Sequence, residues 1–209
     1  MKRHLSIACA TVLAGVTGAS HAATADLRVT GTIQPPSCSI SLTNGGAVDL
    51  GQIDLASLSD VADNSLAAKT VDVTIMCGAA AKVATQVSDD RTGTASTPDN
   101  ANFGLNNTTG GNPIGFYKDF AENGLADSVT TEVIGSTNAT SWVAPVGGVP
   151  VEHGNAKYTA VGTTAGGPAS ATTVAWTLRI EPTIASASSM GITRIEPIDG
   201  QMTLTLVYL

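Results

Sequence analysis

Two runs of alternating apolar and polar residues constrain the fold of this chain more than any other feature of its sequence. Residues 71–77 alternate in this way and place Cys77 on the apolar face. Residues 27–33 show the same alternation. A period of two is the period of a β-strand with one buried face, so both runs predict strands. Cys77 is therefore expected to be buried.

Further strands are expected along most of the chain, with turn residues between them. They are predicted at residues 82–88, 114–118, 128–134, 157–161, 172–180 and 201–208. Clusters of Gly, Asn, Asp, Ser and Thr at residues 89–112 and 163–171 predict loops. Residues 53–68, opened by Asp54, hold too few apolar positions at helical spacing for more than one helical turn, and a connection that crosses between two sheets is the favoured interpretation. Short strands at this density predict an all-β fold, a single β-sandwich domain.

The first 22 residues are typical of a secretory signal peptide. Lys2 and Arg3 precede an apolar run over residues 5–16, and small residues then lead to Ala22. A lipidated cysteine at Cys9 is the alternative, although the apolar run continues past it. We expect export of a chain that begins near residue 23, with no later apolar stretch long enough to anchor it in a membrane.

The charge of the exported chain argues against two classes of partner. Cleavage after residue 22 removes two of the ten basic residues and none of the 17 acidic ones, which leaves a net charge of −9. Nucleic acids and anionic membrane surfaces both repel such a chain. We therefore expect no nucleic-acid partner.

The two remaining cysteines predict a disulfide. Cys38 and Cys77 form an even pair in a chain bound for an oxidising compartment. A bond that closes this 39-residue separation is worth about 4 kcal/mol in the chain-entropy model. Metal binding is the weaker alternative, because two isolated cysteines lack the CxxC spacing and the other ligands of a zinc site.

Catalysis, metals and cofactors find little support in the sequence. The exported chain keeps one histidine, His153, in a turn-like segment without a nucleophile motif. Asp89, Asp90 and Asp99 match no EF-hand spacing, so a solvated loop is the better interpretation. The glycine-rich run at residues 162–167 lacks the lysine of a phosphate loop. We expect a protein that is not an enzyme and binds no metal or cofactor.

Three motifs carry a resemblance to a known family. Gly31-Thr32-Ile33 precedes Cys38, a second cysteine follows 39 residues later, and the chain ends in the strand-like run 200–209. Together they resemble the pilins of chaperone-usher fimbriae. Within that superfamily, residues 198–209 look most like the fimbrial subunits grouped as domain of unknown function 1120.

The resemblance implies a fold and an assembly mechanism. The subunit is expected to be an incomplete immunoglobulin-like β-sandwich that lacks its last strand, so that an apolar groove stays open beside the C-terminal strand. A periplasmic chaperone lends a strand first, and the outer-membrane usher then exchanges it for the N-terminal extension of a neighbouring subunit. The expected product is a fimbrium, a homopolymer on the cell surface.

The C-terminal strand supplies the expected groove residues. Met202, Leu204, Leu206 and Tyr208 lie on one face of an extended strand. By resemblance, Tyr208 matches the terminal tyrosine of the family, and the carboxylate of Leu209 contacts basic chaperone residues. The alternative is an ordinary last strand of a sandwich that completes its own core.

The N-terminal extension supplies the expected donor strand. Residues 23–30 precede the pilin-like domain at residues 31–209, and Ala25, Leu27 and Val29 form its apolar face. Eight residues span about 26 Å as a strand, which is short for a donor. Either residues 31–33 join the donor segment or it fills only part of the groove.

Two functional classes remain open from the sequence. One is a structural fimbrial subunit that supports adhesion. The other is an adhesive binding module, either self-contained and secreted or at the fimbrial tip, for which Trp142 and Trp176 are candidate sugar-stacking residues. The pilin-like motif follows the export signal almost at once, which favours the structural subunit, with any host receptor contacted through exposed loops.

Overall fold

The structure is a computed structural model that describes residues 25–33 and 37–209. The predicted signal peptide, including Cys9, lies outside the described residues. Residues 37–209 belong to one compact unit, and residues 25–33 belong to a separate unit. Within these ranges, no helix has the length and apolar character needed to cross a membrane.

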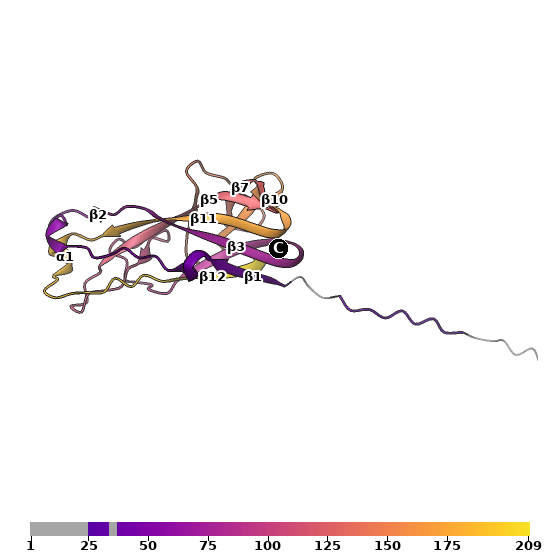
Figure 1. Cartoon of the computed structure of the whole chain (residues 1–209), viewed down its shortest axis with the longest axis horizontal. Helices are drawn as coiled ribbons and strands as arrows, with labels where there is room; N and C mark the ends of the chain where they lie inside the picture. Colours follow the sequence, from indigo (N-terminus) through magenta and orange to yellow (C-terminus); the bar gives the residue numbers. More distant parts are fainter. Residues whose placement is uncertain (1–24, 34–36) are drawn as a thin grey trace, which may run out of the picture. The chain divides into compact units, whose positions relative to one another are not determined.

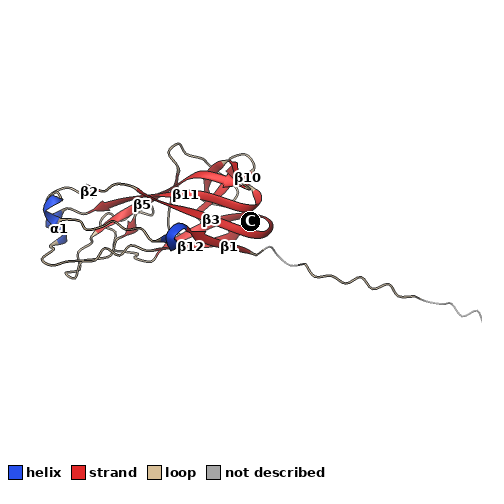
Figure 2. Ribbon diagram, in the orientation of Figure 1, coloured by secondary structure: helices blue, strands red, loops and turns tan. Residues whose placement is uncertain are grey.

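The regular secondary structure of the compact unit is almost entirely strand (Figure 1, Figure 2). The strands are β1 (Cys38–Leu42), β2 (Asn64–Ser65), β3 (Lys69–Asp89), β4 (Phe103–Gly104), β5 (Gly115–Ala126), β6 (Val129–Thr130), β7 (Glu132–Ser136), β8 (Val149–Val151), β9 (Tyr158–Thr163), β10 (Gly167–Pro168), β11 (Ser170–Ile184) and β12 (Met202–Tyr208). The helical segments are η1 (Thr43–Gly46), η2 (Leu55–Ser57) and α1 (Ala187–Met190). The prediction of an all-β fold is confirmed.

Strand β3 belongs to two sheets. Residues 69–77 pair with β1 on one side and with β11 on the other. Residues 83–89 pair with β12 on one side and meet β9 on the other. Between these halves β3 bends close to the C-terminus (Figure 1). The first sheet continues from β11 to β5, and the second continues from β9 to β7.

The core lies between the two sheets and follows the alternation seen in the sequence. Val73 and Ile75 on β3 are fully buried, whereas Asp72, which points to the opposite face of the strand, is exposed. On β11, Trp176 and Leu178 face the same core. Burial of each such side chain is worth about 1.5 to 3 kcal/mol, so the alternation fixes which face of each strand turns inward.

Most of the predicted strands are present, and one is not. The six predicted segments between residues 82 and 208 all overlap strands of the structure. The helical turn is η2, where the Asp54 side chain accepts a hydrogen bond from the amide of Ala56. Residues 27–33 form no strand within their own chain, and their side chains are exposed. A strand needs a partner strand that bonds to its backbone, so alternation alone does not produce a strand.

Candidate functional site: an open groove between two edge strands

The sandwich is open along one side. Within residues 37–209, both β1 and β12 pair only with β3, and each is the outermost strand of its sheet there. The remaining neighbours of β3, which are β11 and β9, lie on its other side. The free edges of β1 and β12 therefore border the same opening, with one edge from each sheet.

A groove of about 1430 Å³ occupies this opening. Its floor is apolar and comes mainly from β11. The floor residues include Val71, Ile114, Leu178, Ile180, Pro182, Ile184 and Met190. One wall is β1 with the segment that follows it, and its apolar residues are Ile40, Leu42, Val48, Leu50 and Ile53. The other wall leads into β12, and its apolar residues are Ile192, Ile198, Met202 and Leu204.

The wall side chains are only half buried. They alternate with exposed residues, as inward-facing side chains of a strand do, yet solvent still reaches them. On β12 the pattern runs from half-buried Met202 through exposed Thr203 to half-buried Leu204. Strands in the middle of the sheets instead bury their inward side chains fully, as Val73 and Leu178 show. Among residues 37–209, no strand covers these two walls.

The backbone of β12 also faces the opening at the same residues. Gln201 accepts a hydrogen bond from the amide of Asp90, and the amide of Leu209 donates to Lys82. These odd-numbered residues turn their backbone groups toward β3. Along an antiparallel strand, successive residues turn those groups to opposite sides. The even-numbered residues that turn them toward the opening are Met202, Leu204, Leu206 and Tyr208.

The backbone of β1 behaves in the same way. Cys38 lies opposite Cys77 with Cα atoms 4.0 Å apart, a spacing typical of a pair that exchanges no backbone hydrogen bonds. The carbonyl of Ser37, by contrast, accepts from the amide of Gly78. The residues whose backbone groups face away from β3 are Cys38, Ile40 and Leu42. Within residues 37–209, both walls thus offer edge groups without a strand partner beside apolar side chains, and the amide of Cys38 is bonded to a side-chain hydroxyl instead.

Side-chain contacts hold the segment that leads into β12. Arg91 Nη2 lies 2.5 Å from Asp199 Oδ2, and the amide of Asp199 donates to Leu105. Farther back, Glu196 Oε2 accepts from the amide of Thr109 at 2.9 Å and from its hydroxyl at 2.8 Å. These two hydrogen bonds, with Arg194 nearby, lower the pKa of Glu196. The wall is therefore fastened to the neighbouring loop rather than to a strand.

Gly200 packs closely against two residues of the groove lining, Leu105 and Tyr117. A Cβ added there would stand 2.9 Å from side-chain atoms of both Leu105 and Tyr117. Burial and the nearby carboxylates, first Asp119 and then Asp89, raise the pKa of the Tyr117 phenol. Tyr117 also stacks on Phe103, with ring centroids 5.2 Å apart. Tyr117 of the groove lining is thus supported by an aromatic contact.

The predicted C-terminal site residues divide into two groups. Met202 and Leu204 line the groove. Leu206 is half buried and packs against the core beyond the groove lining. Tyr208 is 48% exposed, and its hydroxyl reaches β1, while Leu209 is exposed and bonded to β3 through its amide.

The predicted donor face is exposed. Leu27 and Val29 keep 91% and 86% of their surface accessible, and Ala25 is exposed as well. Ile33 is completely exposed. Three large aliphatic side chains exposed on one short segment are unusual in a folded protein.

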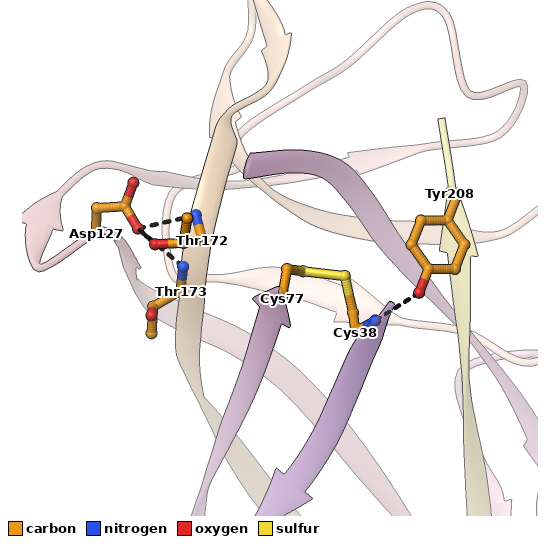
Figure 3. The surroundings of a disulfide bond; sticks show 6 residues. All are labelled: Cys38, Cys77, Asp127, Thr172, Thr173 and Tyr208. Atoms are coloured by element: carbon orange, nitrogen blue, oxygen red, sulfur yellow. Dashed lines mark hydrogen bonds between the residues drawn. A yellow bond between two sulfur atoms is a disulfide. The ribbon is translucent and has the colours of Figure 1, made fainter. Parts of the chain in front are cut away.

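The predicted disulfide is confirmed. Cys38 and Cys77 are bonded, and the bond joins the N-terminal end of β1 to β3 (Figure 3). It therefore fixes one wall of the groove to the strand that both sheets share.

Sequence reasoning missed most of the groove. It identified one wall from the C-terminal alternation, but not Val48, Leu50 and Ile53 of the other wall. Val48 and Leu50, two residues apart, were the available signal, but Ile53 follows three residues later and breaks the period of two. Two glycines and an aspartate interrupt the apolar pattern in this segment and hide it.

Other candidate residues lie away from the groove lining. His153 packs edge-on against Phe103 and bonds to the carbonyl of Asn102, so a structural role accounts for it. Trp142 and Trp176 are both buried, and neither presents a ring face for sugar stacking. In residues 25–33 and 37–209, no group of acidic, histidine and cysteine side chains is arranged to hold a metal ion.

The comparisons with known proteins place the chain in one family. No curated protein matches it. Residues 27–136, just over half of the chain, match the model of a family described as "Protein of unknown function (DUF1120)". The match covers the exposed segment that starts at Leu27, the disulfide, and β1 through β7. The chain therefore belongs to the DUF1120 family.

Proposed function

We propose that this protein is a structural subunit of a chaperone-usher fimbria and that its groove accepts a β-strand from another copy of the chain. The observation that carries the proposal is the coincidence of two features at one opening. Apolar side chains lie half covered there, and within residues 37–209 the backbone groups of the same wall residues have no strand partner. An added strand satisfies both, since main-chain hydrogen bonds give affinity and alternate side chains fill the groove.

The exposed segment at residues 25–33 is the proposed donor. Its inward face would be Ala25, Leu27 and Val29, continued by Gly31 and Ile33. From Leu27 to Ile33 a strand spans about 20 Å. The groove floor on β11 runs from Leu178 to Ile184, which is also about 20 Å. A donor that includes Ile33 therefore matches the length of this floor.

The donor chemistry suits the groove. Each buried aliphatic side chain contributes about 1.5 to 3 kcal/mol, so Leu27, Val29 and Ile33 supply several kcal/mol of association free energy. Gly31 adds no side chain where the inserted backbone would approach the floor closely. Asp26 and Arg28 would face solvent, which keeps the outer face of the completed sheet polar.

The same groove explains the need for other partners. An open apolar groove is an aggregation hazard until a strand covers it. A periplasmic chaperone would cover it during export, and an outer-membrane usher would exchange the chaperone strand for the next subunit. The fimbrium on the cell surface is the resulting localisation, and receptor contact would be spread over exposed loops of many copies.

The test is a gel assay of surface material from cells that express the full precursor with its chaperone and usher. Wild-type subunits are expected to run as a ladder in unheated detergent samples. A double variant, Leu27→Asp with Val29→Asp, places charges on the donor face and is expected to abolish the ladder while the monomer is still exported. Both side chains are exposed in the free chain, so the variant should fold normally.

Thr30→Asp is the matched control, because it adds a charge to the outward face of the same segment. It should leave the ladder intact. Stable monomers from wild-type and variant chains alike would contradict the proposal and support the alternative, a self-contained secreted adhesive module.

A further inference from the structure

A single hydrogen bond joins the two walls at one end of the groove. The amide of Cys38 on β1 donates to the hydroxyl of Tyr208 on β12 over 2.7 Å (Figure 3). The two residues are 170 positions apart in sequence, and their strands belong to different sheets. Among the hydrogen bonds of residues 37–209, this is the one that links β1 directly to β12.

The bond occupies the first free edge group of β1. Cys38, Ile40 and Leu42 turn their backbone groups toward the opening, as the pairing with β3 requires. The Tyr208 phenol takes the amide of Cys38. Ile40 and Leu42 keep their edge groups available to a new strand.

We propose that Tyr208 fixes the end of an added strand and so sets its register in the groove. This inference rests on the proposed strand-acceptor function. A strand that pairs with β1 can bond to Leu42 and Ile40, but at Cys38 it meets the phenol instead of a free amide. A shift of one residue turns every side chain of the added strand to the other face, so only shifts of two residues are allowed. The Tyr208 phenol then selects one of these registers, because it blocks pairing at Cys38.

Both partners of the bond are held in place. The disulfide ties Cys38 to Cys77 on β3, and the amide of Leu209 bonds to Lys82 beside the same bend. Neither wall can move aside at this end without breaking a covalent or backbone contact. The phenol is thus a positioning group on a rigid frame, while the far end of the groove is bordered by segments without strand pairing.

The first experiment follows backbone amide exchange by NMR in the full exported chain that carries Leu27→Asp and Val29→Asp, which keeps the groove free. Adding Tyr208→Phe removes only the hydroxyl. Without the hydroxyl, the Cys38 amide is expected to exchange about 2- to 10-fold faster than with it, whereas the exchange rate of the Ile40 amide is expected to stay the same. Tyr158→Phe, a tyrosine on β9, is the matched control. Equal exchange of the Cys38 amide with and without the hydroxyl overturns the proposal.

The second experiment adds a synthetic peptide of residues 25–33 to the same chains. With Tyr208 present, the peptide should protect the Ile40 and Leu42 amides without changing the solvent protection of Cys38. With Tyr208→Phe, protection should extend to Cys38, a shift of two residues. Protection of the same amides in both chains contradicts a role in register.

The two ideas fail in distinguishable ways. If the peptide protects no amide in either chain, the strand-acceptor function is refuted. The proposed role of Tyr208 in setting the register is then refuted as well, whatever the exchange rate of the Cys38 amide. If the peptide binds but its register ignores the hydroxyl, only the role of Tyr208 is refuted.

Discussion

Asp119 should make the stability of this protein fall as pH rises, the opposite of the usual behaviour of a carboxylate. It lies on the inward face of β5, 1% exposed, between Ile180 of β11 and Val151 of β8. Neither carboxylate oxygen has a hydrogen-bond partner. Burial raises the pKa of Asp119 from 3.8 to about 7, because the charged form loses its hydration.

The sign and size of the effect follow from linkage. Between pH 4 and 7 the folded protein binds a proton at Asp119 that the unfolded chain has released, so unfolding becomes easier as pH increases. Each pKa unit corresponds to about 1.4 kcal/mol, so the loss amounts to about 4 kcal/mol over this range. Stability from this group is fully present below pH 4 and lost above pH 7.

Asp119→Asn removes the titration and nearly preserves the shape. Urea unfolding of both proteins from pH 4 to 8 is the assay, and the difference in unfolding free energy should move by about 4 kcal/mol in favour of the variant. Other carboxylates, including Glu196 with its lowered pKa, cancel in this difference. Asp60→Asn, at an exposed position, is the control. Parallel stability curves for the wild type and Asp119→Asn would refute the reasoning.

Three further predictions concern the groove and its frame. Leu206→Asp should weaken capture by a purified cognate chaperone, because it places a charge on the inward face of β12, whereas Thr205→Asp should not; normal capture of both counts against the strand assignment. Cys38→Ser should lower periplasmic yield, as removal of a native disulfide typically costs 2 to 5 kcal/mol, and free thiols in the wild type with unchanged yield would contradict this. Gly200→Ala should lower the unfolding free energy by about 1 to 3 kcal/mol, because the added Cβ meets two side chains at 2.9 Å. Gly78→Ala should be nearly neutral, because the nearest atoms to its added Cβ are 3.8 Å away. Equal unfolding free energies of the two variants would show that the side chains around Gly200 move aside at no cost.

Strand identity was accessible from the sequence where one face of a strand is buried. Residues 71–77 and 172–180 lie in the middle of the first sheet, and their alternation reports that burial directly. The sharing of β3 between two sheets was not accessible. Nothing in the local pattern distinguishes one strand of 21 residues that bends from two separate strands.

Of the two groove walls, only the β12 wall could be predicted from the sequence. The β12 wall carries a clean alternation that ends in Tyr208. The other wall passes through η1, where Asn44 and Gly45 adopt left-handed backbone angles, and the apolar positions beyond it are spaced irregularly. The contact between Tyr208 and Cys38 depends on tertiary structure, since the two residues are 170 positions apart in the sequence. The alternation at residues 27–33, in turn, predicts a strand that its own unit does not form.

The most direct test of the account measures the stability of the donor-face variant, Leu27→Asp with Val29→Asp, with and without a peptide of residues 25–33. A ligand that binds only the folded state raises the unfolding free energy by about 2.7 kcal/mol at 100 times its Kd. We expect such an increase for the wild-type peptide and none for a peptide with both aspartates. No increase with either peptide, or equal increases with both, would contradict the claim that the groove accepts this strand.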